Sequence, residues 1–177
     1  MDAEVRALKA RAARLDVLIE HIGRAEDAPL ASPEVSRVEV PDLLFGGILH
    51  EGPWSDFGAL AGTVARKAGR YIGGPAVSLC HDDAYLEAAH YEAGFVLKRA
   101  VKGLDCRILE GGPAVRAIHV GPYSTLEFTY ERLMKEVVSR GLEILKPTRE
   151  MYLKGPGLIF AGRPERYRTE VVLRVRA

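Results

Sequence analysis

Two stretches of the chain carry nearly the same short sequence: Ile48-Leu49-His50-Glu51-Gly52-Pro53-Trp54 and Ala117-Ile118-His119-Val120-Gly121-Pro122-Tyr123. Their histidines lie 69 residues apart (119 − 50). Each copy follows an apolar, strand-like run and precedes a helix-like stretch. A histidine–glycine–proline–aromatic corner that occurs twice predicts a duplicated unit. Small-molecule pockets tend to form at the junction between such units.

The composition narrows the class of protein. The 177 residues are enough for one sizeable domain, and 28% charged with 47% hydrophobic residues is ordinary for a globular chain. Lys plus Arg number 25 against 24 Asp plus Glu, so no overall field favours nucleic acid or a membrane surface. No apolar run approaches the roughly 20 residues that span a bilayer, and the N-terminus lacks a signal-peptide core. We therefore expect a cytoplasmic protein with Cys80 and Cys106 as free thiols.

Three segments follow one another along the chain. Residues 1–22 show an apolar seam with alternating steps of three and four residues, which indicates an amphipathic helix. Residues 23–36 are polar, contain prolines, and are predicted to be a linker. Residues 37–177 are predicted to form the domain, in halves at 37–97 and 106–175.

The first half is predicted to run strand, helix, strand, strand. Its first strand contains Gly46-Gly47, which is typical of a bulge or bend. Ser55 or Asp56 can cap the helix, and Gly69 ends it. The two later strands are expected near 76–80 and 88–97.

The second half repeats this order. Its first strand, 106–120, is expected to be interrupted by Gly111-Gly112-Pro113, and Ser124-Thr125-Leu126-Glu127 matches a capping box at the start of a helix. Strands are then expected near 148–153 and 167–175. Two βαββ units predict an α+β fold with one mostly antiparallel sheet, both helices on one face and a ligand cavity at the junction.

Glutamates on the predicted strands are the candidate ligand-binding residues. Glu150 and Tyr152 are two apart on a strand and so share a face, while Glu92 and Glu170 lie on later strands of the two halves. If helices cover one face, the other face forms a concave site that can hold such a carboxylate. A carboxylate among aromatic rings suits a lipophilic cation, since ring faces attract positive charge. The alternative is that these glutamates face solvent or pair with a neighbouring cation.

Aromatic side chains are the candidate pocket walls, although aromatic residues more often fill a core. The candidates are Trp54, Tyr91, Tyr123, Tyr152 and Phe160. Neighbours in Cys80-His81-Asp82-Asp83 point in opposite directions on an extended chain, so no metal site is predicted there. The glycine-rich stretches lack the lysine of a phosphate loop, and we predict no cofactor.

Three motifs in this order resemble the GyrI-like small-molecule-binding domain, the effector-binding fold of many MerR- and AraC-type transcription regulators. They are His119-Val120-Gly121-Pro122-Tyr123, Glu150-Met151-Tyr152-Leu153 and Thr169-Glu170-Val171-Val172. The resemblance covers about 37–175. It implies two βαββ halves around a ligand cavity, lipophilic and often cationic aromatic ligands, and a ligand-contacting glutamate at Glu150.

The resemblance also bears on residues 1–22, which are similar to the dimerisation helix that joins a MerR DNA-binding head to this domain. The sequence starts with this segment, so we expect an effector domain without a DNA-binding head and without direct nucleic-acid or membrane contact. The expected partners are lipophilic cations and a second copy of the chain through this helix.

Three functions remain open at this point. The favoured one is a free-standing multidrug-binding protein that sequesters or senses its ligands and has no reaction of its own. The second comes from the resemblance, because some free-standing members of the family are similar to hydrolases that open cyclopropane rings; it implies a hydrolase of cyclopropane-bearing electrophiles, with Glu150, Glu170 and Tyr152 as catalytic residues. A carboxylate in an apolar site can act as acid or base because burial raises its pKa. The third is a regulator that binds another protein through its surface.

Overall fold

The computed structural model describes residues 33–82, 88–156 and 163–177. The helix predicted at 1–22, most of the predicted linker and Phe160 lie outside the described residues. Within the described ranges no helix has the length and apolarity needed to cross a membrane.

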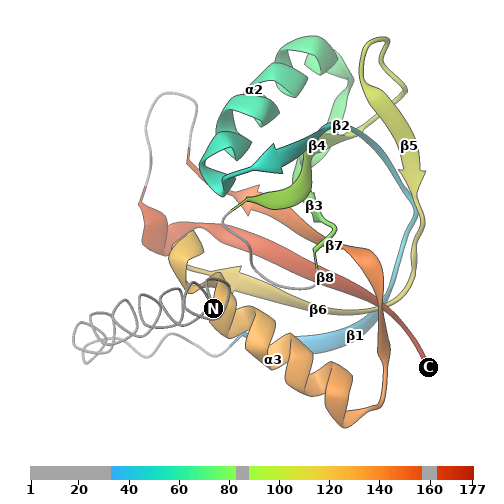
Figure 1. Ribbon diagram of the computed structural model, residues 1–177, viewed down its shortest axis with the longest axis vertical. Helices are drawn as coiled ribbons and strands as arrows, with labels where there is room; N and C mark the ends of the chain where they lie inside the picture. Colours follow the sequence, from blue (N-terminus) through green and yellow to red (C-terminus); the bar gives the residue numbers. More distant parts are fainter. Residues whose placement is uncertain (1–32, 83–87, 157–162) are drawn as a thin grey trace, which may run out of the picture. The chain divides into compact units, whose positions relative to one another are not determined.

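Eight strands form one sheet in which all neighbouring strands are antiparallel. The strands are β1 (Val35–Val40), β2 (Leu43–Gly52), β3 (Ile72–Cys80), β4 (Ala89–Leu97), β5 (Asp105–Leu109), β6 (Gly112–Val120), β7 (Glu143–Lys154) and β8 (Arg168–Arg176). Their order is β1-β6-β8-β7-β3-β4-β2-β5, with β3 and β7 at the centre and β1 and β5 at the edges (Figure 1). The predicted α+β class with a mostly antiparallel sheet is confirmed.

The strand order has the same pattern when read from either edge. Each half contributes two strands, a helix and two further strands, and each half's first strand pairs with the other half: β1 pairs with β6, and β5 pairs with β2. The single interrupted strand predicted over 106–120 is therefore wrong, because β5 and β6 have different partners. Gly112 begins β6 with φ +114°, a backbone conformation that favours glycine.

Two helices lie between the strand pairs. In the first half, η2 (Trp54–Asp56) leads into α2 (Phe57–Ala68), and η3 (Gly69–Tyr71) follows it; in the second, η4 (Tyr123–Thr125) leads into α3 (Leu126–Ser139). A further short turn, η5 (Pro164–Arg166), precedes β8. Gly69 and Gly141 follow the helices with φ +51° and +62°, as the sequence predicted for glycines that end a helix.

Both helices pack on the same face of the sheet, at opposite ends of it (Figure 1). Trp54, Phe57 and Leu60 pack against Tyr91 and its neighbours on β4. Leu133 and Val137 of α3 join a cluster with side chains of β6 and β8. The register of the strands carries one face from Tyr91 of β4 through Cys80 and Ser78 of β3 to Glu150 of β7 and Val171 of β8. The helix-covered face is therefore the face of Glu150.

The two histidine corners hold the strand-to-helix transitions. Nδ1 of His119 lies 2.9 Å from the Thr129 hydroxyl, and its Nε2 lies 3.1 Å from the Pro122 carbonyl. Burial lowers the pKa of His119, although the Pro122 carbonyl acts in the opposite direction. Nε2 of His50 lies 3.1 Å from the Asp56 carboxylate. The hydroxyl of Thr125, the residue before α3, donates a hydrogen bond to the Pro122 carbonyl at 2.8 Å and does not cap the helix.

The opposite face has its own apolar core, built around Phe45. The pair Gly46-Gly47 was predicted to mark a bulge or bend; it is not a bulge, because β2 pairs with β4 in continuous register from Phe45 to Gly52. A Cβ at Gly47 would lie 2.4 Å from the Phe45 ring, and one at Gly94 would lie 2.6 Å from it. These glycines are needed because the ring lies directly against the sheet.

Candidate functional site

Glu150 occupies the boundary between the two halves. It lies on β7 directly opposite Ser78 on β3. Tyr130 of α3 donates a hydrogen bond to its Oε1 at 2.8 Å, and Tyr152 donates one to its Oε2 at 2.7 Å. The Tyr152 hydroxyl also lies 3.3 Å from that of Ser78. Both carboxylate oxygens are therefore held in place by neutral hydroxyl groups.

In the part of the chain that the structure describes, Glu150 has no counter-charge. Burial raises the pKa of Glu150, and the hydrogen bonds from Tyr152, Tyr130 and Ser78 offset that rise only in part. Among the described residues, no lysine, arginine or histidine forms an ion pair with it. Burial also raises the pKa of Tyr130 and Tyr152 well above the ordinary value, so both remain hydroxyl donors at neutral pH. An ionised Glu150 is thus a negative charge that no cation among the described residues balances.

A chain of aromatic contacts flanks Glu150 and crosses from one half to the other. The rings, in order of contact, are Trp54, Tyr91, Phe57, Tyr152, Tyr123 and Tyr167. At its centre, the ring of Tyr152 lies 4.8 Å from Phe57 and 5.5 Å from Tyr123, centroid to centroid. Tyr123 is 37% exposed, and Trp54, Phe57 and Tyr152 are only partly buried. These rings therefore retain surface that a ligand can contact.

The candidate residues divide between the two faces. Trp54, Tyr91, Tyr123, Glu150 and Tyr152 belong to the helix-covered face. This location corrects the expectation that the ligand-binding carboxylate would lie on the face without helices. The sequence could not establish it, because alternation shows which residues share a face but not which face the helices cover.

Two of the predicted glutamates lie away from Glu150. Glu92 is opposite Leu79 on β3, and Glu170 is opposite Met151 on β7, so both point to the other face. Nη1 of Arg116 donates a hydrogen bond to Glu170 at 2.9 Å. The structure therefore does not bring the three predicted glutamates into one site.

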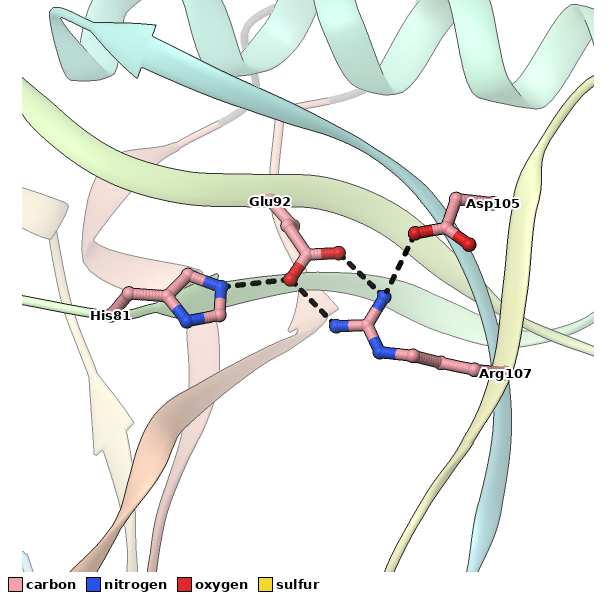
Figure 2. Close-up of polar contacts among 4 residues, drawn as sticks. All are labelled: His81, Glu92, Asp105 and Arg107. Carbon is pink, nitrogen blue, oxygen red and sulfur yellow. Dashed lines mark hydrogen bonds and ion pairs between the residues drawn. The ribbon is translucent and has the colours of Figure 1, made fainter.

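Glu92 instead forms a compact charged cluster with His81, which directly follows β3, and with Arg107 and Asp105 of β5 (Figure 2). It is only 4% exposed, and Arg107 binds both its oxygens, at 2.6 and 2.7 Å. Nε2 of His81 lies 2.8 Å from Oε1. Burial by itself would raise the pKa of Glu92, but Arg107 and His81 outweigh it and lower that pKa. The cluster lines a cleft of about 530 Å³ that also includes Leu49, Asp82, His90 and Asp105.

Among the described residues, no three His, Cys, Asp or Glu side chains are grouped as metal ligands would be. Cys80 and Cys106 are both free thiols, and burial raises the pKa of Cys80.

Three residues of the candidate site had no signal in the sequence that marked them as such. Phe57 and Tyr130 occupied apolar positions of predicted helices, and Ser78 lay inside an apolar strand. Tyr130 reaches Glu150 across 20 residues of sequence, and Ser78 meets it through the pairing of β3 with β7. Only the hydroxyl groups themselves, at positions expected to be buried, pointed to a polar partner.

A comparison with protein families matches residues 33–176 to the GyrI-like small molecule binding domain. A comparison with curated proteins gives no significant match.

Solved structures share this fold at low sequence identity. The EcmrR C-terminal domain is 20% identical, with a TM-score of 0.70 over 81% of this chain and 98% of its own. A hydrolase from Listeria innocua is 18% identical, with a TM-score of 0.58 over 89% of this chain and 98% of its own. SAV2435 bound to tetraphenylphosphonium is 13% identical, with a TM-score of 0.58 over 81% of this chain and 94% of its own.

Proposed function

The chain belongs to the family of GyrI-like small molecule binding domains, and from this premise we propose that it binds lipophilic aromatic cations with Glu150 as their counter-charge. The observation that carries this proposal is the environment of Glu150. Its carboxylate is held by two tyrosine hydroxyls among partly exposed rings, and no described residue neutralises it. The tetraphenylphosphonium bound to SAV2435 is a ligand of this chemical class.

The binding energy of such a ligand comes from charge and from the rings. A charge pair is stronger next to buried groups than in water, because the effective dielectric constant there is lower. Each favourable cation–π contact adds about 0.5–2 kcal/mol. The hydroxyls of Tyr130 and Tyr152 keep the carboxylate oriented, which reduces the entropy lost on binding. A bound cation also favours the ionised form of Glu150, so binding lowers the pKa that burial has raised.

The arrangement of the binding unit is part of the proposal. The ligand enters a cavity at the junction of two halves that arose by duplication, with residues 37–177 as the binding unit. The protein is proposed to act in the cytoplasm by sequestering or sensing its ligands. The repeated element order and the contact of β3 with β7 support this arrangement.

Calorimetric titration with tetraphenylphosphonium tests the proposal. Glu150→Gln is expected to weaken its binding at least tenfold, about 1.4 kcal/mol, because the counter-charge is removed. Binding of neutral triphenylphosphine oxide should change by less than about threefold. The matched control is Glu143→Gln, which removes an exposed carboxylate from the same strand and should leave both affinities unchanged. Equal losses of affinity for the cationic and neutral ligands would refute a site that selects its ligands by their charge.

A second candidate function is hydrolysis of cyclopropane-bearing electrophiles. The raised pKa of Glu150 favours a carboxyl that retains its proton at higher pH and can donate it to a leaving group. One protein with a similar fold is named as a hydrolase. Incubation with a cyclopropane-bearing electrophile separates the two functions: multiple turnovers that disappear in Glu150→Gln support the enzyme, and reversible binding without product supports the binder.

A further inference from the structure

Six exposed basic residues gather at one end of the fold, around the end of α2 and the turn between β4 and β5. This basic end consists of Arg66, Lys67, Arg70, Lys98, Arg99 and Lys102. Neither 66–71 nor 98–103 contains an acidic residue, and no described carboxylate forms an ion pair with any of the six. The rest of the chain has 19 basic and 24 acidic residues, so the positive charge at this end is a local excess.

Specific contacts hold the two segments of the basic end together. The Lys98 N–H donates to the Tyr71 carbonyl at 2.8 Å, and the Lys67 ammonium donates to the Gly103 carbonyl at 3.1 Å. The Arg99 guanidinium lies 4.4 Å from the Tyr71 ring centre. Cations in the last turn of a helix are favoured by its dipole, but this explains only the residues at the end of α2. The basic residues on the β4–β5 turn do not lie at a helix end, so the helix dipole does not account for them.

An open strand edge begins beside the basic end. Among the strands of the described residues, β5 is one of the two edge strands and pairs only with β2, so every second residue directs its backbone N–H and C=O away from the sheet. Figure 1 shows β5 at the outside of the sheet, starting near the end of α2. Ile108 on this strand is 55% exposed. Unpaired backbone groups and an exposed apolar side chain are features of a surface that accepts another strand.

We propose that an extended acidic segment of a partner protein binds here as an additional strand beside β5. The free backbone groups favour a peptide over a nucleic acid, because only a peptide can continue the ladder of hydrogen bonds. The basic end selects an acidic chain and disfavours neutral or basic ones. The position on the outer edge, away from the β3–β7 boundary that holds Glu150, leaves the cation site free.

The probe is a ten-residue fluorescein-labelled peptide of alternating glutamate and valine, followed by fluorescence anisotropy at low salt. The double variant Arg99→Glu, Lys102→Glu is expected to weaken binding at least tenfold. The matched control, Arg132→Glu with Lys135→Glu on the exposed side of α3, should change it less than twofold. Bound peptide should slow hydrogen exchange at the amides of β5. Tetraphenylphosphonium affinity should be unchanged in both variants, which separates this proposal from the role of Glu150.

Several results would overturn the proposal. The acidic peptide could fail to bind saturably, or a lysine–valine peptide could bind equally well. A ten-nucleotide oligo-dT could also bind tightly without slowing hydrogen exchange in β5. Hydrogen exchange at the β5 amides could instead slow with protein concentration and not with added peptide. Together with dimers in sedimentation, that result would assign the edge to a second copy of the chain.

Discussion

Glu92 and Glu150 are carboxylates on opposite faces of one sheet, and the groups around them differ in kind. Glu92 is bound by the Arg107 guanidinium and by His81, whereas Glu150 is bound by the hydroxyls of two tyrosines. Burial disfavours ionisation of both. Only at Glu92 do neighbouring cations reverse that effect, so its pKa is lowered while the pKa of Glu150 is raised.

This difference indicates which of the two carboxylates is available to a ligand. A carboxylate that already has a bidentate arginine gains little from an external cation and loses its internal partner if the ligand displaces it. A carboxylate held only by neutral donors keeps its orientation and still lacks a counter-charge. Glu92 therefore has the features of a structural ion pair, and Glu150 has those of a binding group.

The largest expected effect is on stability. Glu92→Gln leaves Arg107 with only the exposed Asp105 carboxylate, at 3.6 Å, as an anionic partner, and we expect the free energy of unfolding to fall by about 2 kcal/mol. This figure is below the usual cost of breaking a buried pair, because Arg107 is 35% exposed and can be hydrated. Urea unfolding at neutral pH measures the change. An equal loss in Glu150→Gln would remove the distinction between the two carboxylates.

The same comparison shows how far the sequence could predict the molecule. The repeated corners located both strand-to-helix transitions, and Gly69 and Gly141 marked both helix ends, because these are local signals. The pairing of Glu92 with Arg107 is not local: the two residues lie on β4 and β5, which are separated by β2. Period-two alternation placed Glu150 beside Tyr152, but only the register of β3 against β7 brings Ser78 to it.

A second expected effect concerns how the free energy of unfolding changes at acidic pH. The pKa of Glu92 is lower in the folded state than its ordinary 4.5, so its contribution is present above about pH 4.5 and is lost as the pH falls through the lowered value. Stability of the wild-type protein should therefore decline in this range, and Glu92→Gln should decline less. Urea midpoints between pH 3 and 7 measure both curves. Parallel curves would show that Glu92 does not contribute to acid sensitivity.

Glu150 should act in the opposite direction. Its pKa is raised in the folded state, so the folded protein binds more protons than the unfolded chain just above pH 4.5, and stability falls as the pH rises through that window. Glu150→Gln removes this penalty and should stabilise the protein at pH 7 by up to about 1 kcal/mol, as is common for residues kept for binding. Thermal unfolding at pH 4 and pH 7 tests this, since the gain should appear only at the higher pH.

The smallest expected effect isolates the hydroxyl groups that hold Glu150. Tyr130→Phe removes one donor from Oε1 and keeps the ring, so the carboxylate is less well oriented and its pKa rises further. Affinity for tetraphenylphosphonium at pH 7 should fall about threefold, near 0.6 kcal/mol, within the net range of one hydrogen bond. Raising the pH should restore part of this loss, because the carboxylate then ionises fully. A loss of the same size at every pH would mean that Tyr130 only shapes the site, whereas recovery at high pH would show that it sets the charge of Glu150.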